Sequence, residues 1–409
     1  MIRNTANTIN EHSCNTNTLR NILSVFLVLM SIQILPIEGS GTSLIKIMGM
    51  MSMTIIMLLY APIINKAVIL GSAYLLFLTI SIIVNIETFR AETVLYRFVS
   101  VLAFISFYNI VYYKQVFSLD YFIRLIKGLI VAFVVVLIIQ QFLKISFIGY
   151  SSALWINLAK LDRNILAVNS LSLEPSHSAR ILGALAIVLM RLYKCLWGEE
   201  QFTIKNIWRD FKWGVIGLIW AFLSMASGTA IIALFLVVLT MIKKRYSIII
   251  LTVSVSLFVA IPHINYPPVQ RVYKAMSAAT TLNRENIQEA DLSASARILP
   301  FIYTIEHFDL SKKETWIGHG IDTGVKNDKW STKRMIGDMT DYGLIQYIFA
   351  LGLIFTCCIK RFLSVETLFF IILLMAEVRN IYVWWSIFML FSISKYFLLQ
   401  KEYILLRHE

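Results

Sequence analysis

The stretch "FIRLIKGLIVAFVVVLIIQQFLK", residues 122–144, decides the fold class of this chain. From residue 128 to residue 143 it carries no charged side chain. A helix rises about 1.5 Å per residue, so about 20 apolar residues are enough to cross the roughly 30 Å of hydrocarbon in a membrane. The stretch is therefore predicted to be a transmembrane helix.

Comparable stretches recur along the 409 residues, of which 58% are apolar and only 15% are charged. Soluble domains are roughly 45–50% apolar and about 25% charged, so the composition indicates a membrane protein. We expect an all-α polytopic membrane protein of about 12 transmembrane helices. The predicted spans are 21–37, 44–62, 67–86, 94–113, 122–144, 178–197, 211–226, 229–243, 246–262, 341–359, 363–379 and 380–399.

These spans divide the chain into five parts. Residues 1–20 form a polar N-terminal tail without the features of a cleaved signal, so the first span is expected to act as an uncleaved anchor. Nine spans follow within 21–262, with an outer segment at 145–177. A large hydrophilic loop covers 263–340, three more spans cover 341–399, and a short tail covers 400–409.

The distribution of basic residues predicts the orientation. If the N-terminus is cytoplasmic, 19 of the 37 basic residues lie on inner loops and tails and seven on short outer loops. Positive residues are retained on the cytoplasmic side, so both termini are predicted to be cytoplasmic and the long loop to be extracytoplasmic. The net charge of +13 is then mainly a topology signal, and no nucleic-acid partner is expected. The four cysteines fall near the inner side and lack metal-type spacing, so no disulfide, metal or cofactor is expected.

A concentration of polar residues, "SLEPSHSAR" (172–180), precedes the sixth span. Proline is favoured in the first helical turn, so Pro175 is predicted to start the helix with Glu174 at its cap. The spacing places Glu174 and His177 on one face, with Ser176 in the first turn and Arg180 three positions after His177. Free N–H groups at such a helix start attract anions. The alternative interpretation is a simple helix cap in the headgroup layer.

The long loop holds two further patterns. "SARILPFIYTIEHF" (295–308) has the spacing of an amphipathic helix that begins near Arg297 and lies against the membrane or the bundle. "WIGHGIDTG" (316–324) places Gly318 and Gly320 around His319, where glycines permit a tight turn. Arginine forks suit diphosphates, and the alternative interpretation of each arginine is a solvated loop surface. The candidate cations are Arg163, Arg180, Arg271 and Arg297.

Other chemistry lacks its motifs. The chain contains no H-E-x-x-H and no G-x-S-x-G. The carboxylates of "DMTD" (338–341) lack partners and are expected to cap the tenth span. A transporter would carry charged residues within its spans, and acidic ones are nearly absent, with Glu87 and Glu377 near predicted ends.

Taken together, the late outer loop, "SLEPSHSA", "SMASGTAIIALFLVVL" (224–239), the Arg-to-"GHG" loop, "DYGLIQYIFALGLI" (341–354) and "YVWWSIFML" (382–390) resemble bacterial O-antigen and exopolysaccharide polymerases of the Wzy type. These proteins are relatives of the O-antigen ligases. The resemblance covers roughly residues 20–400 and rests on architecture and short patterns.

The resemblance implies a lipid-sugar glycosyltransferase with a GT-C-like membrane fold in the bacterial inner membrane. Its donor and acceptor would be undecaprenyl-pyrophosphate-linked oligosaccharides, joined at the periplasmic face without a metal and with inversion at the anomeric carbon. A chain-length regulator and a flippase are the implied partners. Glu174 is the first candidate base, with His177 or His319 as the second. Ser176, Gly318, Gly320 and the four arginines are candidates for substrate binding, and Arg297 is the first of these.

Three alternatives remain open. An O-antigen ligase shares the architecture. A transporter or flippase would show half-to-half similarity and charges inside the bundle. A membrane sensor or scaffold is the third.

Overall fold

A computed structural model describes residues 2–34, 43–146, 166–241, 267–280, 286–287, 292–320, 334–379 and 381–408. Within these ranges the chain is helical and contains no strand. The expectation of an all-α protein is confirmed for this part of the chain.

In the described part of the chain, six helices are long and apolar enough to cross a membrane. They are α3 (Lys66–Val84), α4 (Ala91–Lys114), α5 (Leu119–Ile145), α6 (Pro175–Gln201), α14 (Met339–Cys357, which continues from the turn Ile336–Asp338) and α16 (Tyr382–His408). Two shorter apolar helices, α2 (Leu44–Tyr60) and α8 (Gly228–Met241), pack among them. The helices indicate a protein embedded in a membrane.

The predicted count of twelve spans is not reached in the described residues. The predicted span 363–379 is wrong as a helix, because α15 covers only Val365–Ile372 and is about 12 Å long. Met375 and Ala376 then adopt positive φ angles, which end the helical path. The predicted span 246–262 lies outside the described residues.

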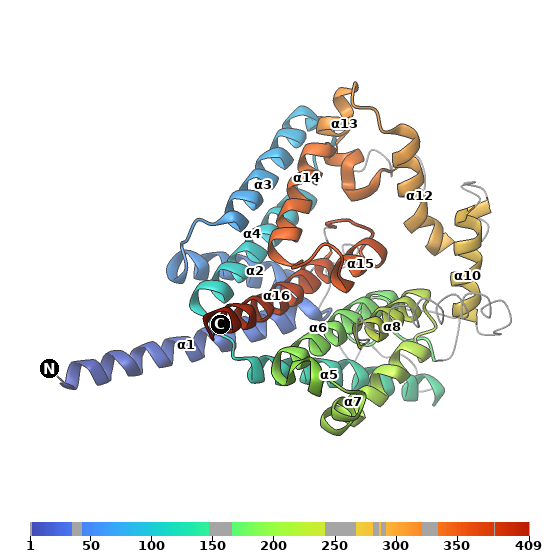
Figure 1. Cartoon of the computed structure of the whole chain (residues 1–409). Coiled ribbons are helices and arrows are strands. Elements are labelled where there is room, and N and C mark those ends of the chain that lie inside the picture. The colour runs from blue at the N-terminus through green and yellow to red at the C-terminus, as the bar shows by residue number, and fades with distance from the viewer. Residues whose placement is uncertain are drawn as a thin grey trace.

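Two other predicted spans differ in extent. α1 (Ile2–Ser31) begins within the predicted tail, and Figure 1 shows its first turns leading away from the bundle. α7 (Ile204–Ser224) breaks its helical geometry at Phe211, where the predicted span 211–226 begins. Only residues 225–227 link α7 to α8.

α6 lies at the centre of one half of the bundle, against α5, α8 and α16 (Figure 1). Its residues Ser178 to Met190 are all buried, including on faces that a surface helix would expose. α2 packs on α4, and α3 packs on α14. Apolar side chains such as Leu59, Leu76 and Phe142 are more than half exposed, as expected for surfaces that face lipid.

The helix ends sort into two groups, which we call the polar end and the lysine end. At the polar end the starts of α2, α6, α14 and α16 lie near the ends of α1, α3 and α5. Ser31 Oγ at the end of α1 lies 2.8 Å from Ser386 Oγ near the start of α16. Gln140 Nε2 near the end of α5 donates to the Ser170 carbonyl, just before α6, at 2.9 Å. At the lysine end, Lys395 Nζ donates to three carbonyls at the C-terminus of α14. A cation there complements the negative end of the helix dipole.

The predicted outer loop contains α10 (Pro267–Thr280), α12 (Leu292–His307) and α13 (Lys313–Ile317). α12 confirms the predicted amphipathic helix. Leu299 and Ile302 are buried together with Ile287, but Ile305 is 79% exposed, so the predicted apolar stripe is only partly covered by protein.

Candidate functional site

The start of α6 forms as the sequence predicts. Pro175 is the first helical residue and Glu174 occupies the cap position with extended backbone angles. Glu174 is exposed, and its Oε2 accepts a hydrogen bond from Ser176 Oγ at 3.2 Å. Ser178, by contrast, is buried and donates to the Asn169 carbonyl, so it fastens the preceding loop to the helix.

The N-terminus of α16 meets this helix start. The Leu173 amide donates to Tyr382 Oη at 3.4 Å, and the His177 ring lies edge-on to the Tyr382 ring at 6.4 Å. Both helices therefore direct their N-termini toward one place. Free N–H groups and positive dipole ends accumulate there, which favours an anion.

Lys46 of α2 adds a buried charge. It is 1% exposed, and its Nζ lies 3.4 Å from the centre of the Tyr382 ring. Among the described residues the ammonium has no hydrogen-bond acceptor and no carboxylate partner. Lys46 falls inside the predicted span 44–62 and was not among the predicted site residues. A lysine within an apolar helix was the signal that could have identified it.

Two arginines lie around one tryptophan of α16. The guanidinium carbon of Arg180 is 5.0 Å, and that of Arg379 5.7 Å, from the centre of the Trp384 ring. Arg180 Nε also donates to the Leu373 carbonyl at 2.9 Å, in the non-helical segment after α15. The buried indole N–H of Trp384 has no acceptor among the described residues.

Glu377 is the only fully enclosed carboxylate next to these groups in the described chain. It is 0% exposed and is paired with Arg379. Glu377 falls near the end of the predicted span 363–379 and was not among the predicted site residues. The break in the helix after Ile372 brings it here, and no local pattern in the sequence indicates that break.

We call these residues the α6 cluster: Lys46, Glu174, Ser176, His177, Arg180, Glu377, Arg379, Tyr382 and Trp384. Three of them are cations, and one carboxylate is buried against one of the three. Burial of an uncompensated cation is costly, so the cluster favours an anion as ligand.

A second set of charges joins α4 to the start of α14. Arg97, 4% exposed, contacts Asp338 at 2.6 Å, and Arg334 also contacts Asp338. Asp338 occupies the predicted cap position of α14, but its side chain makes no cap hydrogen bond and pairs instead with Arg97, which lies inside α4. The buried positions of Lys46 and Arg97 also correct the expectation of a bundle without internal charges.

His319 lies beside this second set and not in the α6 cluster. Its amide donates to the Thr340 carbonyl at 2.8 Å, and the Gly320 amide donates to the Asp341 carbonyl at 3.0 Å. Gly318 has a φ of +86°, and a Cβ there would collide with the Asp341 backbone. Gly318 and Gly320 therefore allow their own backbone to approach that of the first turn of α14. The His319 side chain is exposed.

The remaining candidates are not located at side-chain level. Arg163 lies outside the described residues. Arg271 belongs to α10 and Arg297 to α12, and their side chains lie outside the described part of the structure. Their roles stay predictions. No group of three His, Cys, Asp or Glu side chains suited to a metal occurs among the described residues.

No family model, curated protein or solved structure matches the chain.

Proposed function

We propose that the protein is an O-antigen or related surface-polysaccharide polymerase of the bacterial inner membrane. It transfers a growing glycan from undecaprenyl pyrophosphate to a lipid-linked repeat unit, with the polar end of the bundle facing the periplasm. The observation that carries the proposal is Lys46, a buried cation without an anionic partner in the described chain, beside the converging starts of α6 and α16.

The chemistry of glycan transfer requires this arrangement of charge. The acceptor hydroxyl attacks the anomeric carbon of the donor, and the bond from that carbon to the pyrophosphate oxygen breaks. Negative charge then grows on the leaving undecaprenyl pyrophosphate. Fixed donors at that position lower the barrier because they act most strongly on the transition state. Lys46 and Arg180 supply such donors.

Glu174 is the proposed base that takes the proton of the acceptor hydroxyl. It lies at the exposed rim of the cluster, where a sugar can reach it, whereas Glu377 is enclosed and paired with Arg379. His177 is the alternative base, half-buried against Tyr382. Glu174→Gln should abolish polymerisation if Glu174 is the base, and normal polymer from that variant would transfer the role to His177.

Deletion of the gene, followed by gel separation of the surface polysaccharide, tests the proposal. The ladder of chain lengths should collapse to core plus one repeat unit. Complementation with Lys46→Met should not restore the ladder, whereas Lys66→Met, an exposed lysine at the other end of the bundle, should restore it. An unchanged ladder after deletion would overturn the proposal.

A flippase or transporter is the second candidate, because Lys46 and Arg97 are buried charges within helices. Deletion would then remove every repeat unit from the core and leave lipid-linked units on the cytoplasmic side. A ligase would also give core without repeats, but its lipid-linked polymer would accumulate on the periplasmic side.

A further inference from the structure

A separate cavity opens at the lysine end of the bundle, on the side of α5, α6 and α7. One part, of about 300 Å³, is lined by Trp197, Gln201, Asn206, Arg209 and Asp210. An adjoining part of about 440 Å³ extends past Trp197 and Asp210 to Asp120, Arg124 and Lys127 of α5. None of these residues belongs to the α6 cluster, so the cavity is a second site.

The carboxylate of Asp210 already has partners within the cavity. Lys127 Nζ lies 2.6 Å from Asp210 Oδ2, and the Tyr193 hydroxyl donates to the same oxygen. Partial burial opposes ionisation of Asp210, but the hydrogen bonds from Lys127 and Tyr193, together with the positive charges of Lys127 and Arg209, outweigh it and hold the pKa of Asp210 below its usual value. Asp210 is therefore an anion already matched by Lys127, and it does not need a second cation.

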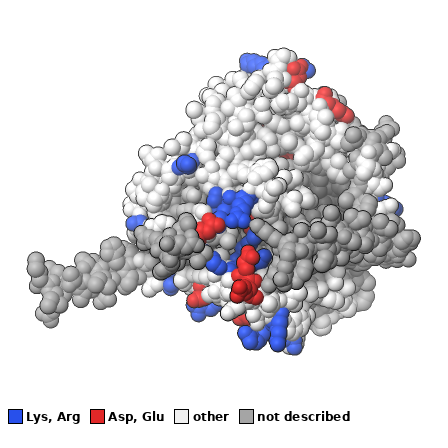
Figure 2. Space-filling model, in the orientation of Figure 1, with Lys and Arg blue, Asp and Glu red and all other residues white. Residues whose placement is uncertain are grey.

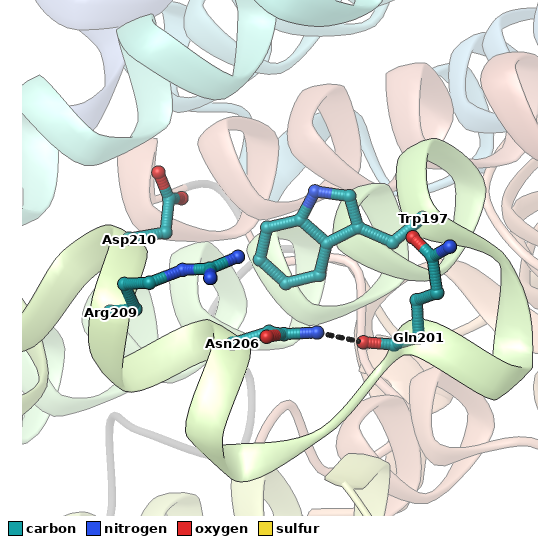
Figure 3. Close-up of a pocket in the computed structure, with 5 residues that line it drawn as sticks. All are labelled: Trp197, Gln201, Asn206, Arg209 and Asp210. Atoms are coloured by element: carbon teal, nitrogen blue, oxygen red, sulfur yellow. Dashed lines mark hydrogen bonds between the residues drawn. The ribbon is translucent and has the colours of Figure 1, made fainter.

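Arg209 is available for an external ligand. Figure 3 shows its guanidinium extending toward the Trp197 ring, between that ring and Asp210. No carboxylate lies within ion-pair distance of Arg209 or of Arg124 among the described residues. Asn206 closes the floor by donating to the Gln201 carbonyl at 2.7 Å. An arginine held over a polar floor presents paired donors, which fit the oxygens of a phosphate.

The outer surface of α7 is suited to a membrane interface. Trp213 is 78% exposed, and Ile204 and Trp208 are also exposed. Lys212 lies over both Trp208 and Trp213, with its Nζ 5.9 Å and 5.3 Å from the two ring centres. Exposed tryptophans with flanking lysines are typical of the headgroup layer, where the rings contact lipid and the ammonium groups contact phosphates.

Charge at this end of the bundle agrees with that placement. Figure 2 shows basic and acidic side chains gathered together in the lower middle of the visible face, while much of the remaining described surface there is white. Under the proposed orientation this end faces the cytoplasm, and cytoplasmic leaflets carry anionic lipids that attract basic segments. The cavity therefore opens where anionic headgroups are available.

We propose that the cavity between α5, α6 and α7 binds the phosphate headgroup of an anionic phospholipid, with Arg209 and Arg124 on the phosphate and Trp208 and Trp213 against the acyl chains. Bound lipid would fasten the first turns of α7 to α5 and α6. The site is independent of glycan transfer, since it is built from different residues at the other end of the bundle.

The test uses the purified full-length protein, stripped of lipid in detergent, and native mass spectrometry with added phosphatidylglycerol or phosphatidylcholine. Wild type should retain phosphatidylglycerol in preference to phosphatidylcholine. Arg209→Gln should lower that retention about tenfold, the loss expected for one charge-assisted contact. Lys205→Gln is the matched control, because Lys205 is an exposed cation of α7 that does not line the cavity.

Three results would overturn the proposal. The first is equal retention by wild type and Arg209→Gln. The second is an equal loss for Lys205→Gln and Arg209→Gln, which would indicate diffuse attraction without a site. The third is displacement of phosphatidylglycerol by millimolar inorganic phosphate, which would identify the ligand as a free anion.

Discussion

Three charged residues of this protein are buried among apolar side chains of the helix bundle. Lys46, Arg97 and Glu377 are each less than 5% exposed. Arg97 is matched by Asp338, and Glu377 by Arg379, so their charges are compensated within the protein. Among the described residues, Lys46 is compensated only by the face of Tyr382, and this difference separates a structural charge from one proposed to bind substrate.

Arg97→Met should destabilise the protein strongly, because Asp338 would lose a partner in a site that is almost closed to solvent. Removing one member of a buried ion pair typically costs about 3–5 kcal/mol, and Arg334 compensates part of that loss. The midpoint of thermal unfolding in detergent measures the effect. Lys312→Gln removes the exposed partner of Asp309 and should change the midpoint little. Equal midpoints for both variants would contradict the structural role of Arg97.

The sequence identified half of the α6 cluster and missed the other half for a physical reason. Glu174, Ser176, His177 and Arg180 lie within seven positions at the start of one helix, so a local pattern reveals them. Lys46, Glu377, Arg379, Tyr382 and Trp384 come from three other segments. The packing of α16 on α6 and the contact of Lys46 with the Tyr382 ring bring them close. Tertiary packing of that kind leaves no local signal in a single sequence.

At the scale of elements, the long helices were predictable and the breaks were not. Apolar runs predict α3, α4, α5 and α6 because length and composition alone suffice to cross a membrane. α15 has the same composition but ends at Ile372, where the chain turns back through positive-φ residues. The contact between the backbone of Gly318 and the start of α14 was equally hidden, since it depends on where two segments meet.

Gly318→Ala tests that contact. The added methyl group would collide with the Asp341 backbone at a residue whose φ already disfavours a side chain, so we expect a loss of at least about 2 kcal/mol in stability. Gly128→Ala is the control, because a Cβ at Gly128 meets open space within a helix and should stabilise it by up to about 1 kcal/mol. Circular dichroism during thermal unfolding distinguishes the two. A lower unfolding midpoint for Gly128→Ala than for Gly318→Ala would contradict the packing described.

At the scale of the whole molecule, the two ends of the bundle differ in chemistry. The polar end holds the α6 cluster and the Arg97–Asp338 pair, while the lysine end holds helix C-termini capped by Lys395 and Lys401. Such a difference matches the predicted orientation, with the lysine end in the cytoplasm.

Cysteine labelling tests this orientation. In a variant without the four native cysteines, Lys312→Cys in the outer loop should react with a membrane-impermeant maleimide in intact spheroplasts. Lys205→Cys on α7 should react only after permeabilisation. Both positions are exposed, so access to reagent depends on the side of the membrane alone. The reverse pattern would place the α6 cluster on the cytoplasmic face and exclude a periplasmic polymerase.

Reconstitution tests the central claim most directly. Purified protein in liposomes is supplied with one synthetic repeat unit on undecaprenyl pyrophosphate, and products are separated by length. Wild type should form dimers and longer chains with release of undecaprenyl pyrophosphate, and Lys46→Met should form none while it retains the unfolding midpoint of wild type. Chain growth by Lys46→Met at the wild-type rate, or no growth by folded wild type, would contradict the account.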